Sequence, residues 1–461
     1  MKNSVKKYSC IAAAVFLLFA TACKKTSTKP PVTPPVTDTV KQFGTPFASV
    51  PDTKDVAMYE VNISAFSSTK NLAGVTSRLD SIKALGINTV WLMPTYPVGR
   101  LKSFGSPYCV MNYLQVNPSF GTLGDLRTLV STAHSKGMSV ILDWVADHTS
   151  WDNPWIANKS WYKQDGSGNI IAPPGTTYTD VAALNYNSAD MRKAMIKAMK
   201  YWVLEANIDG YRCDYADAIP TDFWSQAIDS LNHTGHKLVL LSEGSRAANL
   251  SSGFAINFGW NFYGAVVNVF GSGQANASGI GSANGQDISS IPSGTYMLHF
   301  TDNHDYDNTG AAPLAIYNGK SGSLAAFAIT INMGGVPLVY SGQEVGVSAN
   351  QVINQNTSIN WSSNPDLLAA YKKLILFRNT SAAVKAGSVT LFNDPDVVVF
   401  ERISGAETVL VIANTRNKVI NYAVAPGLQS TNWNDALNTG NTVSLQTNLS
   451  LQPYAYYVLK N

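Results

Sequence analysis

The sequence has few charged residues for its length of 461 residues. Charged residues make up 14% of the chain and hydrophobic residues 45%, a balance that excludes a disordered chain or a long coiled coil. The net charge is +3, and the first 22 residues contain three lysines and no acid, so the rest of the chain is neutral. Because nucleic-acid binding needs a basic surface, we expect no nucleic-acid partner.

Cysteine is also scarce, with four residues in all. Cys10 lies in the N-terminal leader and Cys23 directly follows it, which leaves Cys109 and Cys213 in the remainder of the chain. These two do not have the spacing of a metal-binding motif. We expect them to be free, mostly buried thiols, with a disulfide between them as the alternative.

The N-terminal apolar run, residues 11–20, is too short to span a bilayer. It follows a basic start and precedes small residues, the pattern of an export signal over residues 1–22. The stretch Phe19-Ala20-Thr21-Ala22-Cys23 resembles a bacterial lipobox, whose cysteine carries lipid. An ordinary cleaved signal with an incidental cysteine is the alternative.

Residues 23–50 are rich in Pro and Thr and poor in large apolar residues, which predicts an extended tether and favours the lipid anchor on Cys23. Folding is expected to start near Asp55. We therefore expect an exported protein that is attached through lipid to a bacterial membrane, the outer membrane being favoured, and that faces the periplasm or the cell exterior.

After the tether, short β-rich segments alternate with longer helical patterns such as residues 123–135. This alternation is typical of a parallel sheet. Eight such strands indicate the α/β class and a (β/α)8 TIM barrel over residues 51–385. The expected strands are residues 56–62, 87–93, 138–144, 208–214, 238–242, 254–258, 295–300 and 336–341.

Two further regions differ from the barrel pattern. Residues 149–185 are polar and rich in Gly, Pro, Trp and Tyr, which predicts a short loop domain after the third strand. Residues 386–461 follow a helical stretch and contain alternating strand patterns, as at 396–402 and 407–414. They predict a C-terminal antiparallel β-sandwich without chemistry of its own.

Polar clusters follow several of the expected strands. Arg212 and Asp214 are two apart on one strand and point to the same side, so the arginine should lower the pKa of Asp214 and keep it ionised for nucleophilic attack. An ordinary ion pair is the alternative. Glu243 follows an apolar strand, where burial would raise its pKa towards general-acid use; a helix cap is the alternative.

Two more clusters, Asp143 to His148 and Asn303-His304-Asp305, follow the third and seventh strands. Such groups can bind vicinal sugar hydroxyls, although a metal site would use similar ones. The clusters should surround one mouth, because active sites of such barrels lie at the carboxyl ends of the strands. Two carboxylates that flank a glycosidic bond are what glycoside hydrolysis requires.

In order and spacing, these four clusters resemble the four signature regions of the α-amylase family, glycoside hydrolase family thirteen. The resemblance extends from about residue 55 to the C-terminus. It implies that Asp214 is the nucleophile, Glu243 the general acid/base and Asp305 the residue that binds sugar hydroxyls and stabilises the transition state. Supporting matches are Met58-Tyr59-Glu60-Val61 and the segments 86–94, 117–122 and 335–344.

The resemblance also implies a set of residues that bind substrate. Arg212 would orient the nucleophile, and His148, Asn303 and His304 would contact the sugar. Tyr108 would lie under that sugar as an aromatic platform, with a packed loop tyrosine as the alternative. Asp143, the aspartate of the first region, is expected to be architectural.

The sequence departs from the family at its calcium ligands. Asp147 stands where many members have Asn, Asn185 where they have an acid, and Ala218 where they have His. We expect at most a weak Ca²⁺ site and no organic cofactor. The arginine that usually follows Asp305 is also missing, since Tyr306-Asp307-Asn308 stands there.

The resemblance therefore implies a retaining hydrolase of α-1,4 bonds in starch-like glucans or maltooligosaccharides, and we expect a monomer with an accessible cleft. Another reaction of the same family, such as α-1,6 cleavage, glycosyl transfer or isomerisation, is the first alternative. A catalytically silent starch-binding lipoprotein is the second, and loss of a catalytic acid would favour it. All three acids are present.

Overall fold

The computed structural model describes residues 40–305, 312–347 and 357–461. The expected signal at residues 1–22, Cys23 and most of the expected tether lie outside the described residues, as does the segment Tyr306-Asp307-Asn308. In the part of the chain that is described, no helix combines the length and the apolar character that a membrane span requires.

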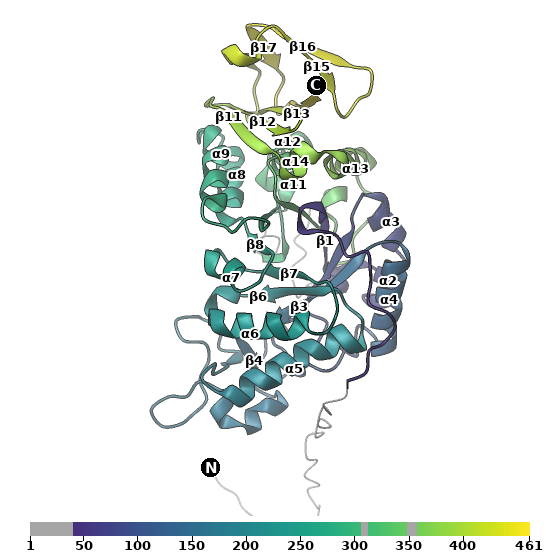
Figure 1. Cartoon of the computed structure of the whole chain (residues 1–461), viewed down its shortest axis with the longest axis vertical. Helices are drawn as coiled ribbons and strands as arrows, with labels where there is room; N and C mark the ends of the chain where they lie inside the picture. Colours follow the sequence, from purple (N-terminus) through teal and green to yellow (C-terminus); the bar gives the residue numbers. More distant parts are fainter. Residues whose placement is uncertain (1–39, 306–311, 348–356) are drawn as a thin grey trace, which may run out of the picture. The chain divides into compact units, whose positions relative to one another are not determined.

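Eight parallel strands close into a barrel in the order β1-β10-β9-β8-β7-β6-β3-β2 (Figure 1). Each strand lies within a segment that the sequence predicts or extends it by one residue, so the TIM barrel is confirmed. The barrel strands are β1 (Met58–Val61), β2 (Thr89–Leu92), β3 (Ser139–Val145), β6 (Gly210–Asp214), β7 (Val239–Ser242), β8 (Ile256–Phe258), β9 (Tyr296–His299) and β10 (Val336–Tyr340).

Alternating side chains give each barrel strand two apolar faces. One set, which includes Trp91, Ile141 and Leu241, forms a core of its own, and the other packs in a larger core with apolar helix residues such as Leu126.

Helix α5 lies beside α6, and α8 beside α9 (Figure 1). The helices of this region are α1 (Ile63–Phe66), α2 (Leu72–Thr76), α3 (Leu79–Ala84), α4 (Leu123–Ser135), α5 (Ala189–Glu205), α6 (Thr221–Asn232), α7 (Ala247–Ser251), α8 (Trp260–Ser272), α9 (Ser278–Ile288), α11 (Pro313–Ile316), α12 (Lys320–Asn332), α13 (Pro365–Thr380) and α14 (Ala382–Ala386).

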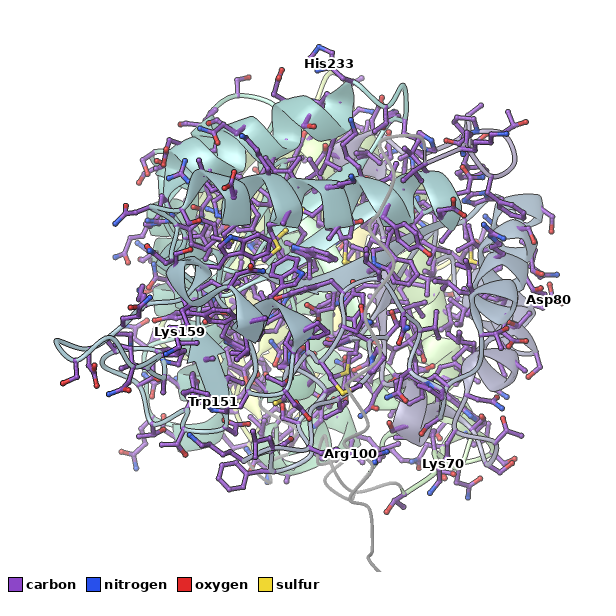
Figure 2. The ribbon with its side chains drawn as sticks, turned by 90° about the horizontal axis from the view of Figure 1, so that it is seen from below. Lys70, Asp80, Arg100, Trp151, Lys159 and His233 are labelled. Atoms are coloured by element: carbon purple, nitrogen blue, oxygen red, sulfur yellow. The ribbon has the colours of Figure 1, made fainter. Side chains whose placement is uncertain are left out.

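The segment after β3 is a short insertion built on an antiparallel strand pair. Strand β4 (His148–Ser150) pairs with β5 (Val181–Ala183), which places His148 opposite Ala183. In Figure 2 this insertion, marked by Trp151 and Lys159, lies on the opposite side of the view from Asp80 of α3. The pairing fixes both ends of the insertion at the carboxyl end of β3.

The C-terminal region is antiparallel, and the expected sandwich is confirmed. A six-stranded sheet and a two-stranded sheet share a core that includes Leu410, Trp433 and Leu451. The six-stranded sheet consists of β11 (Ser388–Phe392), β12 (Val397–Ser404), β13 (Glu407–Asn414), β18 (Tyr456–Lys460), β15 (Thr431–Asp435) and β16 (Thr442–Leu445), and the smaller sheet of β14 (Ile420–Ala423) and β17 (Asn448–Leu451).

The final residues of the expected tether pack on the barrel. The Phe43 N–H donates to Leu204 O at 2.8 Å, Phe47 stacks on His134 with ring centroids 4.3 Å apart, and Val50 is buried. Packing therefore begins earlier in the chain than the expected start near Asp55. The reason is that these three apolar anchors are spaced within a stretch whose overall composition is that of a linker.

Candidate active site

The predicted acidic residues meet at the carboxyl ends of the barrel strands. Asp214 ends β6, and Glu243 directly follows β7. Both line a cavity of about 280 Å³. Six of the eight predicted catalytic and sugar-binding residues line it: Tyr108, His148, Asp214, Glu243, His304 and Asp305.

Arg212 lies beneath this cavity and pairs with three carboxylates. Its Nη1 lies 2.8 Å from Asp143 Oδ1 and 2.7 Å from Asp214 Oδ1, and its Nη2 lies 2.8 Å from Glu243 Oε2. The guanidinium is fully buried. Because an arginine keeps its charge when buried and offers several donors in one plane, a single cation holds Asp214 and Glu243 close together.

The net pKa shift of Asp214 is opposite to the one that the sequence suggests. Burial raises the pKa of Asp214 to about 6, although the Arg212 charge acts to lower it. The expected lowering is therefore wrong, because desolvation of the carboxylate at the strand end outweighs the neighbouring cation. Even so, Asp214 is mostly ionised at neutral pH.

Glu243 has the raised pKa that its position predicts. Burial raises the pKa of Glu243 to about 7, with Arg212 acting against it and Asp214 and Asp305 adding to it. Its Oε2 also accepts a hydrogen bond from the Tyr215 N–H at 2.7 Å. Of the two carboxyl groups, Glu243 therefore holds its proton to the higher pH, the division of roles that an acid and a nucleophile need.

His304 contacts a buried acid, Glu60, whose role in the site the sequence analysis did not identify. Its Nδ1 lies 2.5 Å from Glu60 Oε1, and its Nε2 lies 2.8 Å from the Tyr108 hydroxyl and 3.3 Å from Asp305 Oδ1. Burial lowers the pKa of His304, but Asp305 and Glu60 more than reverse this and bring it to about 10. The sequence signal was present, since Glu60 is a charged residue inside an apolar strand.

His148 is held in a similar way, by Asp147 and by the backbone of Tyr108. Its Nδ1 lies 2.9 Å from Asp147 Oδ1, and its Nε2 lies 3.0 Å from the Tyr108 carbonyl oxygen. Burial lowers the pKa of His148, but the Asp147 carboxylate reverses the effect and brings it to about 9. Both histidines are thus cationic, hydrogen-bonding groups at neutral pH.

The Tyr108 ring stacks on His304, with centroids 5.4 Å apart, and faces the cavity. Its hydroxyl donates to Asp143 Oδ2 at 3.0 Å, and the Trp91 indole N–H donates to the same oxygen at 3.1 Å. Asp143 is fully buried and connects Tyr108, Trp91 and Arg212. Hydrogen bonds and an ion pair to Asp143 therefore connect these side chains into one network.

Two predicted residues do not line the cavity. Arg212 lies below it, and Asn303 is buried with its Oδ1 accepting the Asp305 N–H at 3.0 Å. Asn303 therefore holds the backbone of Asp305. Tyr178 and Tyr215 do line the cavity, but they come from loops, which carry no hydrophobic period that could have marked them.

The positions at which the sequence departs from the usual calcium ligands make contacts of their own. Asp147 turns its carboxylate to His148, Asn185 Oδ1 accepts the Asn187 N–H at 3.1 Å, and the Ala218 side chain has no ligand atom. Among the residues that the structure describes, no three His, Cys, Asp or Glu side chains form a group that could hold a metal ion.

Cys109 and Cys213 are both free and buried, as expected. Cys109 lines the cavity, and burial raises the pKa of its thiol to about 11. A thiol with such a high pKa is protonated at neutral pH and is a poor nucleophile.

A closed parallel barrel with paired acids at its carboxyl end is the arrangement of barrel glycosidases, and comparison with known proteins agrees with it. The model of the alpha-amylase catalytic domain matches residues 59–168. Alpha-amylase 2 of Dictyoglomus thermophilum is 24% identical over 76% of this chain and 64% of its own length. A cyclomaltodextrinase of Thermoanaerobacter pseudethanolicus is 25% identical over 85% of this chain and 71% of its own.

A solved structure shows the same fold. A noncanonic maltogenic alpha-amylase from Thermotoga neapolitana has a TM-score of 0.79 at 24% identity, covering 89% of this chain and 99% of that one. The chain spans 44 to 65% of the length of the first curated relatives that it matches. On these findings, the chain is similar to proteins of the α-amylase family, glycoside hydrolase family thirteen.

Proposed function

We propose that the protein is a retaining glycoside hydrolase that cleaves α-1,4-glucosidic bonds in starch-like glucans or maltooligosaccharides. The observation that carries the proposal is the pair Asp214 and Glu243, held by one guanidinium at a single cavity with pKa values of about 6 and 7. Retaining enzymes use two carboxyl groups about 5 Å apart, one as nucleophile and one as acid.

In the first step, a carboxylate oxygen of Asp214 attacks the anomeric carbon, and Glu243 gives its proton to the leaving glycosidic oxygen as the C–O bond breaks. The product is a β-linked glycosyl ester on Asp214. In the second step Glu243 takes a proton from water, and the water oxygen displaces Asp214 from the anomeric carbon. Two inversions restore the α-configuration.

The residues around the pair fit the remaining needs of this reaction. His148 and His304, both cationic at neutral pH, line the cavity as fixed positive charges, and Tyr108 lines it as an aromatic residue. Asp305 offers a carboxylate whose backbone is fixed by Asn303. Binding that strengthens as the glycosyl carbon gains positive charge lowers the barrier.

Other reactions of the family are the second candidate. The relatives carry the names alpha-amylase, cyclomaltodextrinase and cyclomaltodextrin glucanotransferase. Hydrolysis of α-1,4 bonds, α-1,6 cleavage and glycosyl transfer can share the same covalent intermediate, so the acceptor and the linkage distinguish them. A silent glucan-binding protein is disfavoured, because the three acids all line one cavity.

We also propose that the chain is exported, is lipidated at Cys23 on a bacterial outer membrane, and acts as a monomer without an organic cofactor. The support is the lipobox-like stretch and the Pro/Thr-rich segment after it. The enzyme would face the periplasm or the cell exterior.

Release of reducing ends from starch by the full chain in detergent tests the activity. We expect release by the wild type and by Asp229→Asn, which alters an exposed carboxylate on α6, and strong loss in Asp305→Asn. Products from maltoheptaose, pullulan and dextran then define the linkage. Absence of release from all four glucans would overturn the proposal, and release from pullulan or dextran but not from maltoheptaose would favour α-1,6 cleavage.

A further inference from the structure

Tyr215 combines three features that its position in the chain does not require. It immediately follows Asp214, it lines the cavity, and 46% of the residue is exposed. Within the described part of the chain, its ring makes no hydrogen bond and no aromatic stacking contact. A large exposed aromatic ring beside a buried acid pair is available for a ligand.

The backbone of Tyr215 is also held in an unfavourable conformation. Its φ of 43° and ψ of 44° lie in the left-handed region, which costs a residue with a Cβ on the order of 1 kcal/mol. Neighbouring hydrogen bonds hold the turn, since the Ala216 N–H donates to Glu243 O and the Glu243 N–H donates to Cys213 O, both at 2.9 Å. The loops after β6 and β7 therefore fix where the ring projects.

This conformation places Tyr215 next to the proton donor. Its N–H donates to Glu243 Oε2 at 2.7 Å, so the residue that carries the ring also touches the general acid. A general acid lies on the leaving-group side of the bond that it cleaves, because it protonates the leaving oxygen. Tyr215 therefore lies beside the group that faces the departing sugar, whereas the Tyr108 ring stacks on His304.

We propose that Tyr215 is the stacking platform for the leaving-group sugar, and for any sugar that replaces it as acceptor. The inference rests on the proposed function and adds to it the residue that selects the acceptor. A sugar held against this ring occupies the side from which water must approach the glycosyl ester. Tyr215 therefore also sets how often the glycosyl group passes to a sugar hydroxyl instead of water.

Two substrates with the same donor group distinguish a role in binding the leaving sugar from a general effect on catalysis. Maltotriose, cleaved to maltose and glucose, places a glucose as the leaving group, whereas maltosyl fluoride offers fluoride at the same position. In Tyr215→Ala we expect the ratio of kcat/KM for maltotriose to kcat/KM for maltosyl fluoride to fall about tenfold, the size of one aromatic stacking contact. The share of transfer product with added glucose as acceptor should fall with it.

Matched variants make the result specific. Tyr215→Phe keeps the ring and should hold the ratio within about twofold of wild type, since stacking needs the ring face and not the hydroxyl. Phe104→Ala removes another exposed aromatic side chain, 73% exposed and outside the cavity wall, and should leave the ratio unchanged. This pattern supports the proposal.

Equal losses on both substrates in Tyr215→Ala would show a structural role and overturn it, as would an unchanged ratio. A selective loss in Tyr178→Ala but not in Tyr215→Ala would place the leaving sugar on the insertion and overturn it as well. If the wild type cleaves neither substrate, the proposed function fails, and this inference fails with it; if it cleaves both, only the inference is at stake.

Discussion

At the scale of single residues, Arg212 holds Asp214 and Glu243 together, and burial raises the pKa of both carboxyl groups. Arg212 and Asp214 are two apart on a strand, which already implied that they meet. The degree of burial is a property of the folded barrel, and it reverses the expected shift of Asp214. Glu60 was visible as an acid in an apolar strand, yet its partner His304 is 244 residues away.

The two carboxyl groups predict a narrow pH optimum. Activity needs Asp214 ionised and Glu243 protonated, so kcat/KM for maltotriose should rise as the pH increases through about 6 and fall through about 7. Because both acids contact Arg212, they titrate together. The two apparent pKa values of the pH profile therefore belong to the pair and not to either residue alone. With maltosyl fluoride the alkaline limb of the first step should weaken, since fluoride needs little protonation. A plateau that extends well above neutral pH with maltotriose would contradict the assignment.

At the scale of elements, the barrel strands were predictable because β-rich and helical patterns alternate along the chain. The packing of residues 43–50 was not, because three apolar anchors are hidden in a Pro/Thr-rich composition. The loops that carry Tyr178 and Tyr215 follow no period at all. What they contribute depends on backbone turns that only the fold defines.

Asp217 illustrates how two such loops are fixed. Its carboxylate accepts hydrogen bonds from Ser245 N at 2.9 Å, Asn249 Nδ2 at 2.7 Å and Arg246 Nε at 3.2 Å, which ties the loop after β6 to the one after β7. Asp217→Ala should lower the free energy of unfolding by about 1–3 kcal/mol, measured by urea denaturation, because the buried Asn249 amide and two further donors lose their acceptor.

The control for this prediction is Asp229→Ala. Asp229 lies on α6 with 75% of its side chain exposed, and its loss should cost less than about 0.5 kcal/mol. Similar losses in the two variants would show that Asp217 does not fasten the loops.

Calcium dependence is a second prediction at this scale. Asp147, Asn185 and Ala218 do not form the usual ligand set, since Asp147 pairs with His148 and Asn185 with Asn187. Excess chelator should therefore lower the Tm by less than about 2 °C, equivalent to less than 1 kcal/mol. A larger fall that calcium alone restores would show that a calcium site forms.

At the scale of the whole molecule, a barrel with the site and a sandwich without one follow an N-terminal segment whose sequence predicts export. The sandwich contributes its own core and no residue of the cavity wall. Both regions were predictable in class and order, because changes in pattern along the chain mark them. The attachment to a membrane stays a prediction from residues 1–50.

Lipidation of Cys23 has a direct chemical test. A thioether to diacylglycerol needs the thiol, so Cys23→Ser should yield a form without lipid, while mass spectrometry of the detergent-extracted wild type should show a mature N-terminus at a lipidated Cys23. An N-terminus at any other residue would contradict the anchor.

The central claim is a double displacement in which Asp214 forms the glycosyl ester. Proton NMR of the first products from maltoheptaose tests it most directly, with Asp214→Asn measured beside the wild type. We predict α-anomers first, and less than about 1% of the wild-type rate in Asp214→Asn, because loss of the nucleophile raises the barrier by several kcal/mol. β-Anomers first, or a variant that keeps more than that rate, would contradict the account.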